Sequence, residues 1–116
     1  ASGTIDSTGK IRIIEELLTS DEIDAVITHG NGHIGFWKEG YPKGMLHMIR
    51  DEVLTIRGAY EVSQKYQKPV IVGNMLTMVE SQAVKEQIEN GYRVFHRLDD
   101  MADTLYAMYS YYRRKN

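Results

Sequence analysis

The chain has 116 residues, of which 42% are hydrophobic and 26% charged, a balance that is typical of one folded domain and excludes an intrinsically disordered chain. Its net charge of -2 gives no long-range attraction to a polyanion, so we do not expect a nucleic-acid partner. The chain has no cysteine and no apolar run near the roughly 20 residues that cross a bilayer, so we expect a cytoplasmic protein that makes no disulfides and enters no membrane.

The first half of the chain reads as a helix, a strand and a longer helix. Ser7 or Thr8 is placed to cap the first helix, whose apolar residues recur at helical spacing. The β-branched run 23–29 (IDAVITH) predicts a strand that is buried on both faces. A second helix runs to about Tyr66, and Gly58 weakens it slightly. Its inward side carries Met45, Ile49, Val53, Ile56 and Tyr60.

The second half repeats the strand and helix pattern twice. Pro69 starts a buried strand over 70–72, because proline suits only the first position of a strand. A helix with Leu76, Val79, Ala83 and Ile88 inward follows and ends at Asn90-Gly91. Residues 92–96 predict a third strand, and Asp99 caps the last helix. The stripe of that helix is Met101, Leu105, Met108 or Tyr109, and Tyr112, and its basic end is Arg113, Arg114 and Lys115.

Strands that alternate with helices of this length require right-handed crossover connections, which place helices on both faces of a parallel sheet. We therefore expect residues 1–116 to form a single α/β domain with three layers (α/β/α), of the flavodoxin-like or Rossmann-like kind. The chain opens on a helix with no strand before it. Either residues 1–6 supply an edge strand, or the chain is a fragment of a longer protein, truncated at its N-terminus, and we favour the fragment.

The connection after the first strand is the first candidate for a functional site. Residues 30–43 (GNGHIGFWKEGYPK) form a loop of about fourteen residues, longer than such connections usually are. Its glycines permit a close backbone approach, and it leads to the positive N-terminus of a helix, a geometry that suits phosphate. The alternative is that the glycines only shape the loop. The predicted phosphate-binding residues are Asn31, Gly32, His33, Gly35, Lys43 and Gly44.

The aromatic residues of the same loop, Phe36, Trp37 and Tyr41, either pack over the end of the sheet or anchor a partner. With the tyrosines of the last helix they offer more aromatic surface than a small core absorbs, so we expect a homo-oligomer or docking onto a neighbouring domain. No metal site and no catalytic residue are predicted. His29, His33 and His47 do not have the spacing of a metal site, and the chain has neither a GxxxxGK[ST] loop nor a nucleophile elbow.

Three segments, LLTSDEIDAVI, QKPVIV and IENGYRVFHRLDDMADTLYAMYSYYRR, resemble in order and spacing the last flavodoxin-like domain of the NDP-forming acyl-CoA synthetases, the relatives of succinyl-CoA synthetase. The resemblance covers nearly the whole chain. It implies a parent enzyme that interconverts acyl-CoA, NDP and phosphate with the free acid, CoA and NTP through a phosphohistidine. It also implies that CoA and ATP or ADP with Mg are bound by neighbouring CoA-binding and ATP-grasp domains or subunits, and that this domain binds no cofactor.

The resemblance does not supply the phosphohistidine. In the family this residue follows the strand that corresponds to residues 70–72, but here the loop reads GNMLT, so the carrier role does not transfer. By position, residues 31–35 correspond instead to a loop that leads to a helix N-terminus facing the phosphohistidine. The resemblance thus implies a domain that forms an interdomain interface and one wall of a phosphate site. The alternative is a stand-alone α/β binding or regulatory module without ligase activity.

Overall fold

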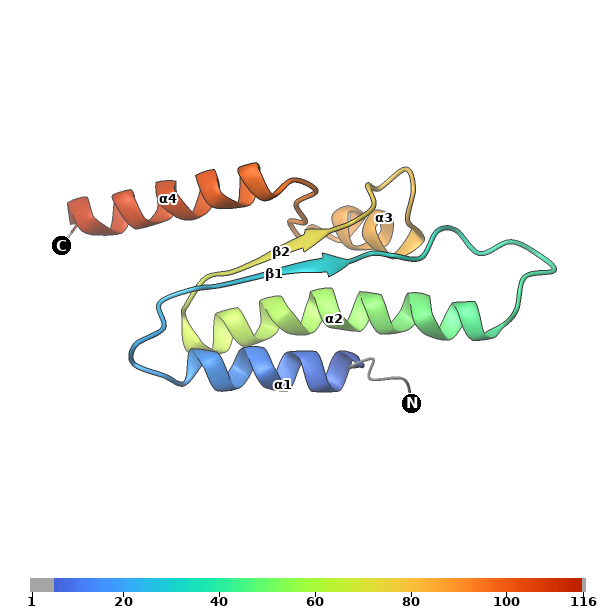
Figure 1. The fold of residues 1–116 in the computed structure, drawn as a ribbon, viewed down its shortest axis with the longest axis horizontal. Helices are drawn as coiled ribbons and strands as arrows, with labels where there is room; N and C mark the ends of the chain where they lie inside the picture. Colours follow the sequence, from blue (N-terminus) through green and yellow to red (C-terminus); the bar gives the residue numbers. More distant parts are fainter. Residues whose placement is uncertain (1–5, 116) are drawn as a thin grey trace.

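The computed structural model describes the backbone of residues 6–115 and the side chains of residues 6–111. Figure 1 shows an α/β fold, as the sequence predicts. The elements in chain order are α1 (Ser7–Leu18), β1 (Val26–Asn31), α2 (Gly44–Tyr66), β2 (Val70–Asn74), α3 (Gln82–Glu89) and α4 (Leu98–Lys115). The hypothesis of an edge strand at residues 1–6 falls almost wholly outside the described residues, as do the side chains of Tyr112 and of the basic residues 113–115.

Strands β1 and β2 pair in parallel, with Val26 opposite Val70 and an irregularity after Thr28. The parallel pairing follows from the long crossover through α2. Strand β1 begins three residues later than the run 23–29 predicts, and it is not buried on both faces: Ile27 is 41% exposed. The reason is that β2 is its one neighbour among the described residues, so its second edge and part of one face stay uncovered.

The predicted third strand over 92–96 is wrong as a strand. Among the described residues it is reduced to one parallel bridge, between Gly73 and Phe95. The N–H of Phe95 donates to the Val72 carbonyl at 2.9 Å, and the Phe95 carbonyl accepts from the N–H of Asn74 at 2.8 Å. Earlier in the segment, the hydroxyl of Tyr60 donates a hydrogen bond to the Arg93 carbonyl. This carbonyl therefore does not pair with β2, and the ladder does not extend.

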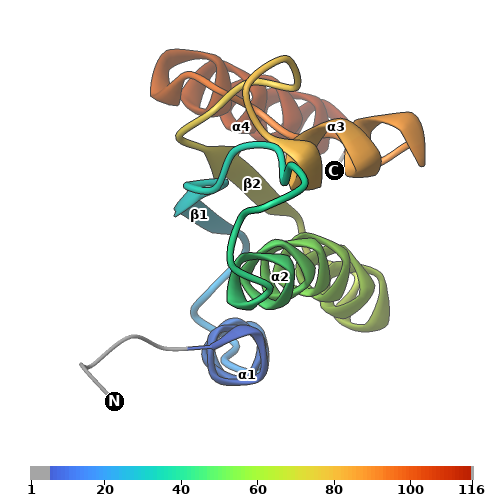
Figure 2. The same ribbon diagram turned by 90° about the vertical axis from the view of Figure 1, so that its right-hand side faces the viewer.

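The two faces of the sheet carry different helices, because alternate side chains of β2 point in opposite directions. Val70 and Val72 pack with α1 and α2 around Ile56, whereas Ile71 packs with Phe95 and with Met101 of α4. Helix α3 packs on α2 through Ala83. Figure 2 shows α4 on the opposite side of the sheet from α1 and α2. Helices therefore cover both faces of a parallel sheet.

Several predicted helix ends need correction. Asp6, and not Ser7 or Thr8, caps α1, because its carboxylate accepts the N–H of Gly9 at 2.9 Å. Helix α3 begins only at Gln82, after its cap Ser81, so Val79 precedes the helix and is 80% exposed. At the last helix, Asp99 lies within the first turn, where a carboxylate favours the positive end of the dipole.

Gly58 has a packing role that helix propensity does not reveal. Helices α1 and α2 approach each other so closely here that a Cβ at Gly58 would run into the side chain of Ile11. A glycine in the middle of a helix usually costs about 1 kcal/mol relative to alanine. In this chain that cost accompanies a tight contact between two helices.

Candidate functional site

Ligands of open α/β sheets bind beyond the carboxyl ends of the strands, so we examine the edge where β1 and β2 end. The loop between β1 and α2 starts here, and Figure 1 shows that it passes the end of the sheet and then extends away before it returns to α2. Asn31 is buried, and its side-chain amide donates to the Gly73 carbonyl at 3.2 Å. The N–H of Met75 donates to the Asn31 carbonyl at 2.6 Å. The two strand ends are thereby tied together.

Position 32 requires a glycine for two reasons, its backbone conformation and the lack of space for a side chain. Its φ of 71° lies in the left-handed region, and an added Cβ would come within 3.0 Å of Val84 and 3.2 Å of Asn74. Gly30 also has a positive φ, of 95°. The first two glycines of the loop thus have a demonstrable structural role. Gly35 has no positive φ, and a Cβ added to it would lie 3.5 Å from the carbonyl oxygen of Glu80, an ordinary contact.

A carboxylate from α2 holds the start of this loop. The backbone N–H of His33 donates to Glu52 Oε1 at 2.7 Å, and His33 Nδ1 lies 3.8 Å from the same oxygen. Glu52 is only 9% exposed, and burial raises the pKa of its carboxyl above the usual range, against the hydrogen bond and charge of His33. Its second oxygen, Oε2, is buried and has no hydrogen-bond partner among the described residues.

This contact changes the electrostatics of the predicted phosphate site. In the predicted phosphate site the backbone N–H of His33 would donate to the anion. This N–H already donates to the Glu52 carboxylate, and a charged carboxylate repels phosphate. Two polar side chains from other elements, Asn74 of β2 and Gln87 of α3, are also buried. Asn74 Oδ1 and both polar atoms of the Gln87 side chain have no hydrogen-bond partner among the described residues.

The predicted phosphate residues fall into two groups in space. Residues 31–35 lie beside the middle of α2, because His33 bonds to Glu52, whereas Lys43 and Gly44 lie at its start. Glu52 is eight residues after Gly44, which corresponds to about 12 Å along a helix. Lys43 and Gly44 are exposed, and the N–H groups after them already donate to the carbonyls of residues 42 and 43. Anion binding at either group stays a prediction.

The three aromatic residues of the loop lie in different environments. Trp37 is half-buried and packs with the apolar contact between α2 and α3 that includes Ile49. Its backbone N–H donates to Gln82 Oε1 at 3.0 Å, and its indole N–H has no hydrogen-bond partner among the described residues. Phe36 and Tyr41 are exposed. Trp37 therefore anchors the loop, and Phe36 and Tyr41 are the aromatic side chains that the loop presents at the surface.

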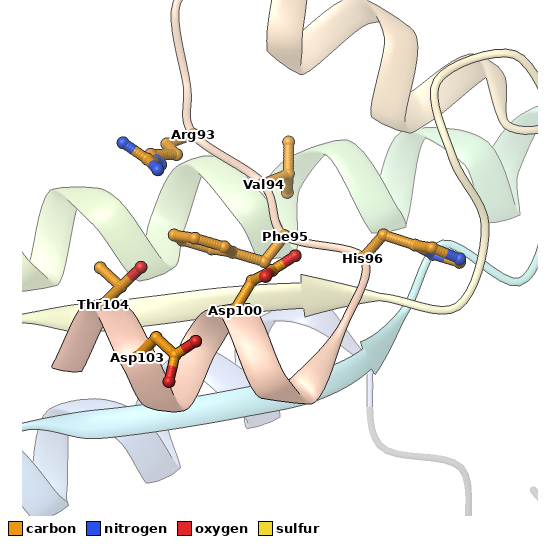
Figure 3. Close-up of a pocket in the computed structure, with 7 residues that line it drawn as sticks. All are labelled: Arg93, Val94, Phe95, His96, Asp100, Asp103 and Thr104. Carbon is orange, nitrogen blue, oxygen red and sulfur yellow. The ribbon is translucent and has the colours of Figure 1, made fainter. Parts of the chain in front are cut away.

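A hollow of about 360 Å³ lies away from all the predicted site residues, between the segment before α4 and the first turns of that helix. The guanidinium of Arg93 lies 4.9 Å from the centre of the Phe95 ring. Figure 3 shows that Asp100, Asp103 and Thr104 of α4 face this segment, whereas His96 points away from them. The lining residues are Arg93, Val94, Phe95, His96, Asp100, Asp103 and Thr104.

Sequence reasoning missed Glu52, although a signal was present. Glu52 lies three residues after Ile49 and four before Ile56, so helical spacing places it on the apolar side of α2. A charged residue on such a side needs a partner, and the N–H of His33 supplies one. His47, in contrast, is exposed on α2.

No family model, curated protein or solved structure matches the chain. Over residues 6–111, no three His, Cys, Asp or Glu side chains are grouped so that they would hold a metal ion. None of the described helices combines the length and the apolar character that a membrane span needs.

Proposed function

We propose that the chain is a flavodoxin-like domain of an NDP-forming acyl-CoA synthetase and that it contributes an interdomain interface, without binding nucleotide itself. The parent enzyme would convert acyl-CoA, NDP and phosphate into the free acid, CoA and NTP in the cytoplasm. The three sequence segments that resemble this family support the proposal, as does the order of the elements in which they lie. One segment joins α1 to β1, the second is β2, and the third runs from α3 to α4.

The observation that carries the interface role is the exposure of Phe36 and Tyr41 on a loop that Trp37 anchors to the body of the domain. Exposed aromatic side chains on an anchored loop cost little conformational entropy when a partner covers them. The loop lies at the carboxyl ends of the strands, where α/β domains meet their ligands and neighbours. The proposed partners are the CoA-binding and ATP-grasp domains or subunits of the parent enzyme.

The residues at this edge do not fit a nucleotide phosphate. The Glu52 carboxylate bonds to the N–H of His33, and the chain has no GxxxxGK[ST] loop. CoA and ATP or ADP with Mg are therefore assigned to the neighbouring domains, and no chemical step is derived for them here. Any contribution of this chain to a phosphate site would come from Lys43 and Gly44 at the start of α2, where a positive charge lies beside a helix N-terminus.

A second candidate function is a stand-alone binding or regulatory module. The open hollow of about 360 Å³ favours it, because polar side chains and an aromatic ring line one side of it. The two candidates differ in their neighbours. An acyl-CoA synthetase domain needs CoA-binding and ATP-grasp segments in its reading frame or in an adjacent one, and a stand-alone module does not.

The decisive experiment expresses the chain with the segments that flank it in its genome and measures acyl-CoA formation from ATP, acid and CoA. We expect activity from the assembly and none from residues 1–116 alone. Tyr41→Glu should weaken assembly, whereas Leu54→Glu should not, since Leu54 has a similar exposure on α2 (41% against 44%) but lies outside the loop. Activity of the isolated chain, or equal effects of both variants, would contradict the proposal.

A further inference from the structure

Helix α4 is only partly seated on the sheet. Met101, in its first turns, is fully buried against Ile71 and Phe95, and Leu105 is half-buried one turn later. Met108, the next residue on that side, is exposed. Figure 1 shows why: the C-terminal part of α4 extends beyond the strands. Apolar side chains that continue the stripe of α4 therefore have no sheet beneath them.

A second apolar flank of α4 faces neither the sheet nor the hollow. At about 100° per residue, Leu98, Ala102, Tyr106 and Tyr109 share one flank, on the opposite side from Asp100 and Thr104, which line the hollow. All four residues of this flank are exposed, Tyr106 to 72%. Spacings of three and four residues between apolar side chains are those with which helices pair, and Ala102 permits close approach.

The charges of α4 are distributed so that the helix is complementary to itself. Its first six residues include Asp99, Asp100 and Asp103, and its sequence ends on Arg113, Arg114 and Lys115. Two copies that lie antiparallel bring the acidic start of each helix to the basic end of the other. The two helix dipoles then also oppose each other favourably. A parallel pair would instead place like charges side by side at both ends.

We propose that the flank formed by Leu98, Ala102, Tyr106 and Tyr109 binds the same flank of a second copy of this chain. The two α4 helices pack antiparallel about a two-fold axis, which is the arrangement in which one patch contacts itself. In this register Tyr106 lies beside the axis, and the acidic start of each helix lies level with the basic end of the other sequence. Asp99 at this start also pairs with Arg97 of its own chain at 3.0 Å. The inference does not rest on the proposed ligase function, since the dimer uses α4 and not the aromatic loop.

Sedimentation velocity and light scattering over a range of concentrations test the dimer. Ala102→Glu places an unpaired charge in the contact, and we expect it to raise the dissociation constant about 30-fold or more. Ala107→Glu is the matched control, because Ala107 is also exposed but lies on the other side of α4. We expect the control to change the constant by less than about threefold. Circular dichroism verifies that both variants fold.

Two further measurements fix the register. Asp99→Lys and Arg113→Asp should each weaken self-association, and a mixture of the two variants should associate again as a heterodimer. Because the chain has no cysteine, Tyr106→Cys should form a disulfide-linked dimer on mild oxidation, whereas Ala107→Cys should not. A monomer at every concentration would overturn the proposal, as would equal effects of Ala102→Glu and Ala107→Glu or equal cross-linking of the two cysteine variants.

Discussion

Helices cover the two faces of the small sheet to different degrees. On the face covered by α2, against which α1 packs in turn, Ile56 is fully buried in a cluster that joins both helices to both strands. On the other face, α4 buries Met101 but leaves Met108 exposed, and Ile27 of β1 is uncovered. Both faces carry helices with an apolar stripe. The difference shows that a stripe is buried only as far as another element covers it. The loop with Trp37 and helix α3 cover Ile49 of α2, whereas the sheet, two strands wide among the described residues, leaves Met108 of α4 exposed.

The largest expected effect separates the two faces by their energetics. Ile56→Ala should lower the free energy of unfolding by about 3–4 kcal/mol, because it opens a cavity in the closed core. Leu105→Ala should cost about 1–2 kcal/mol, because that side chain is only partly buried. Denaturant unfolding of both variants measures the difference. Equal losses would show that the α4 face is as well packed as the α2 face.

The next effect concerns the carboxylate that holds the loop. Glu52→Ala should cost about 1–3 kcal/mol, because it leaves the N–H of His33 without an acceptor. Glu52→Gln keeps an acceptor and removes a buried charge, so we expect it to be at least as stable as the parent at pH 7. Thermal unfolding of the two variants tests this. A large loss in Glu52→Gln would show that the charge itself is needed.

The pH dependence of the same carboxyl sharpens this test. Because burial raises the pKa of Glu52 in the folded chain, the folded state binds the proton more tightly than the unfolded state. The contribution of this group to stability is therefore full below the usual pKa of a glutamate and is lost as the pH rises through the raised value. The stability of Glu52→Gln relative to the parent should grow over that interval. A constant difference would contradict the raised pKa.

A smaller effect tests the contact between α1 and α2. Gly58→Ala gains about 1 kcal/mol of helix propensity but forces the Ile11 side chain to move. We expect a net loss of about 1 kcal/mol, and adding Ile11→Val, which shortens the obstructing side chain, should recover part of it. A higher urea midpoint of unfolding for Gly58→Ala would show that α1 moves away from the added methyl group without a loss of stability.

The smallest effect is on the surface of the α2 face. Lys65 Nζ lies 2.7 Å from Glu15 Oε2, and this hydrogen bond, with one from the Tyr66 hydroxyl, lowers the pKa of Glu15. Lys65→Ala should raise the pKa of Glu15 toward its usual value and barely change the unfolding midpoint. An NMR titration of the Glu15 carboxyl measures the shift, and an unchanged pKa would mean that the pair does not form in solution.

Sequence reasoning found the elements that local pattern determines. The apolar stripe of α2 and the start of β2 at Val70 follow from spacing and from proline chemistry, and the structure confirms them. The prediction of a strand over 92–96 was wrong. The apolar residues of this segment have strand character, but a strand forms only where the backbone pairs with a neighbouring strand. Only Phe95 reaches one.

The candidate site was harder to predict because its parts come from different elements. The glycines of the loop were visible, but Glu52 lies about twenty residues from them and meets His33 only through the tertiary fold. The aromatic residues were also seen, but nothing local tells Trp37, which packs inward, from Phe36, which does not. The self-complementary charge of α4 was present in the sequence, but its meaning depends on which flank the sheet leaves open.

Hydrogen exchange at several protein concentrations tests the contrast between the two faces most directly. We expect the amides of α2 to be protected to the same extent at every concentration, because the core on that face is complete within one chain. The amides of α4 between Leu98 and Tyr111 should gain protection as the concentration rises, because a second copy covers their exposed flank. Protection of α4 that equals that of α2 and does not change with concentration would contradict this account.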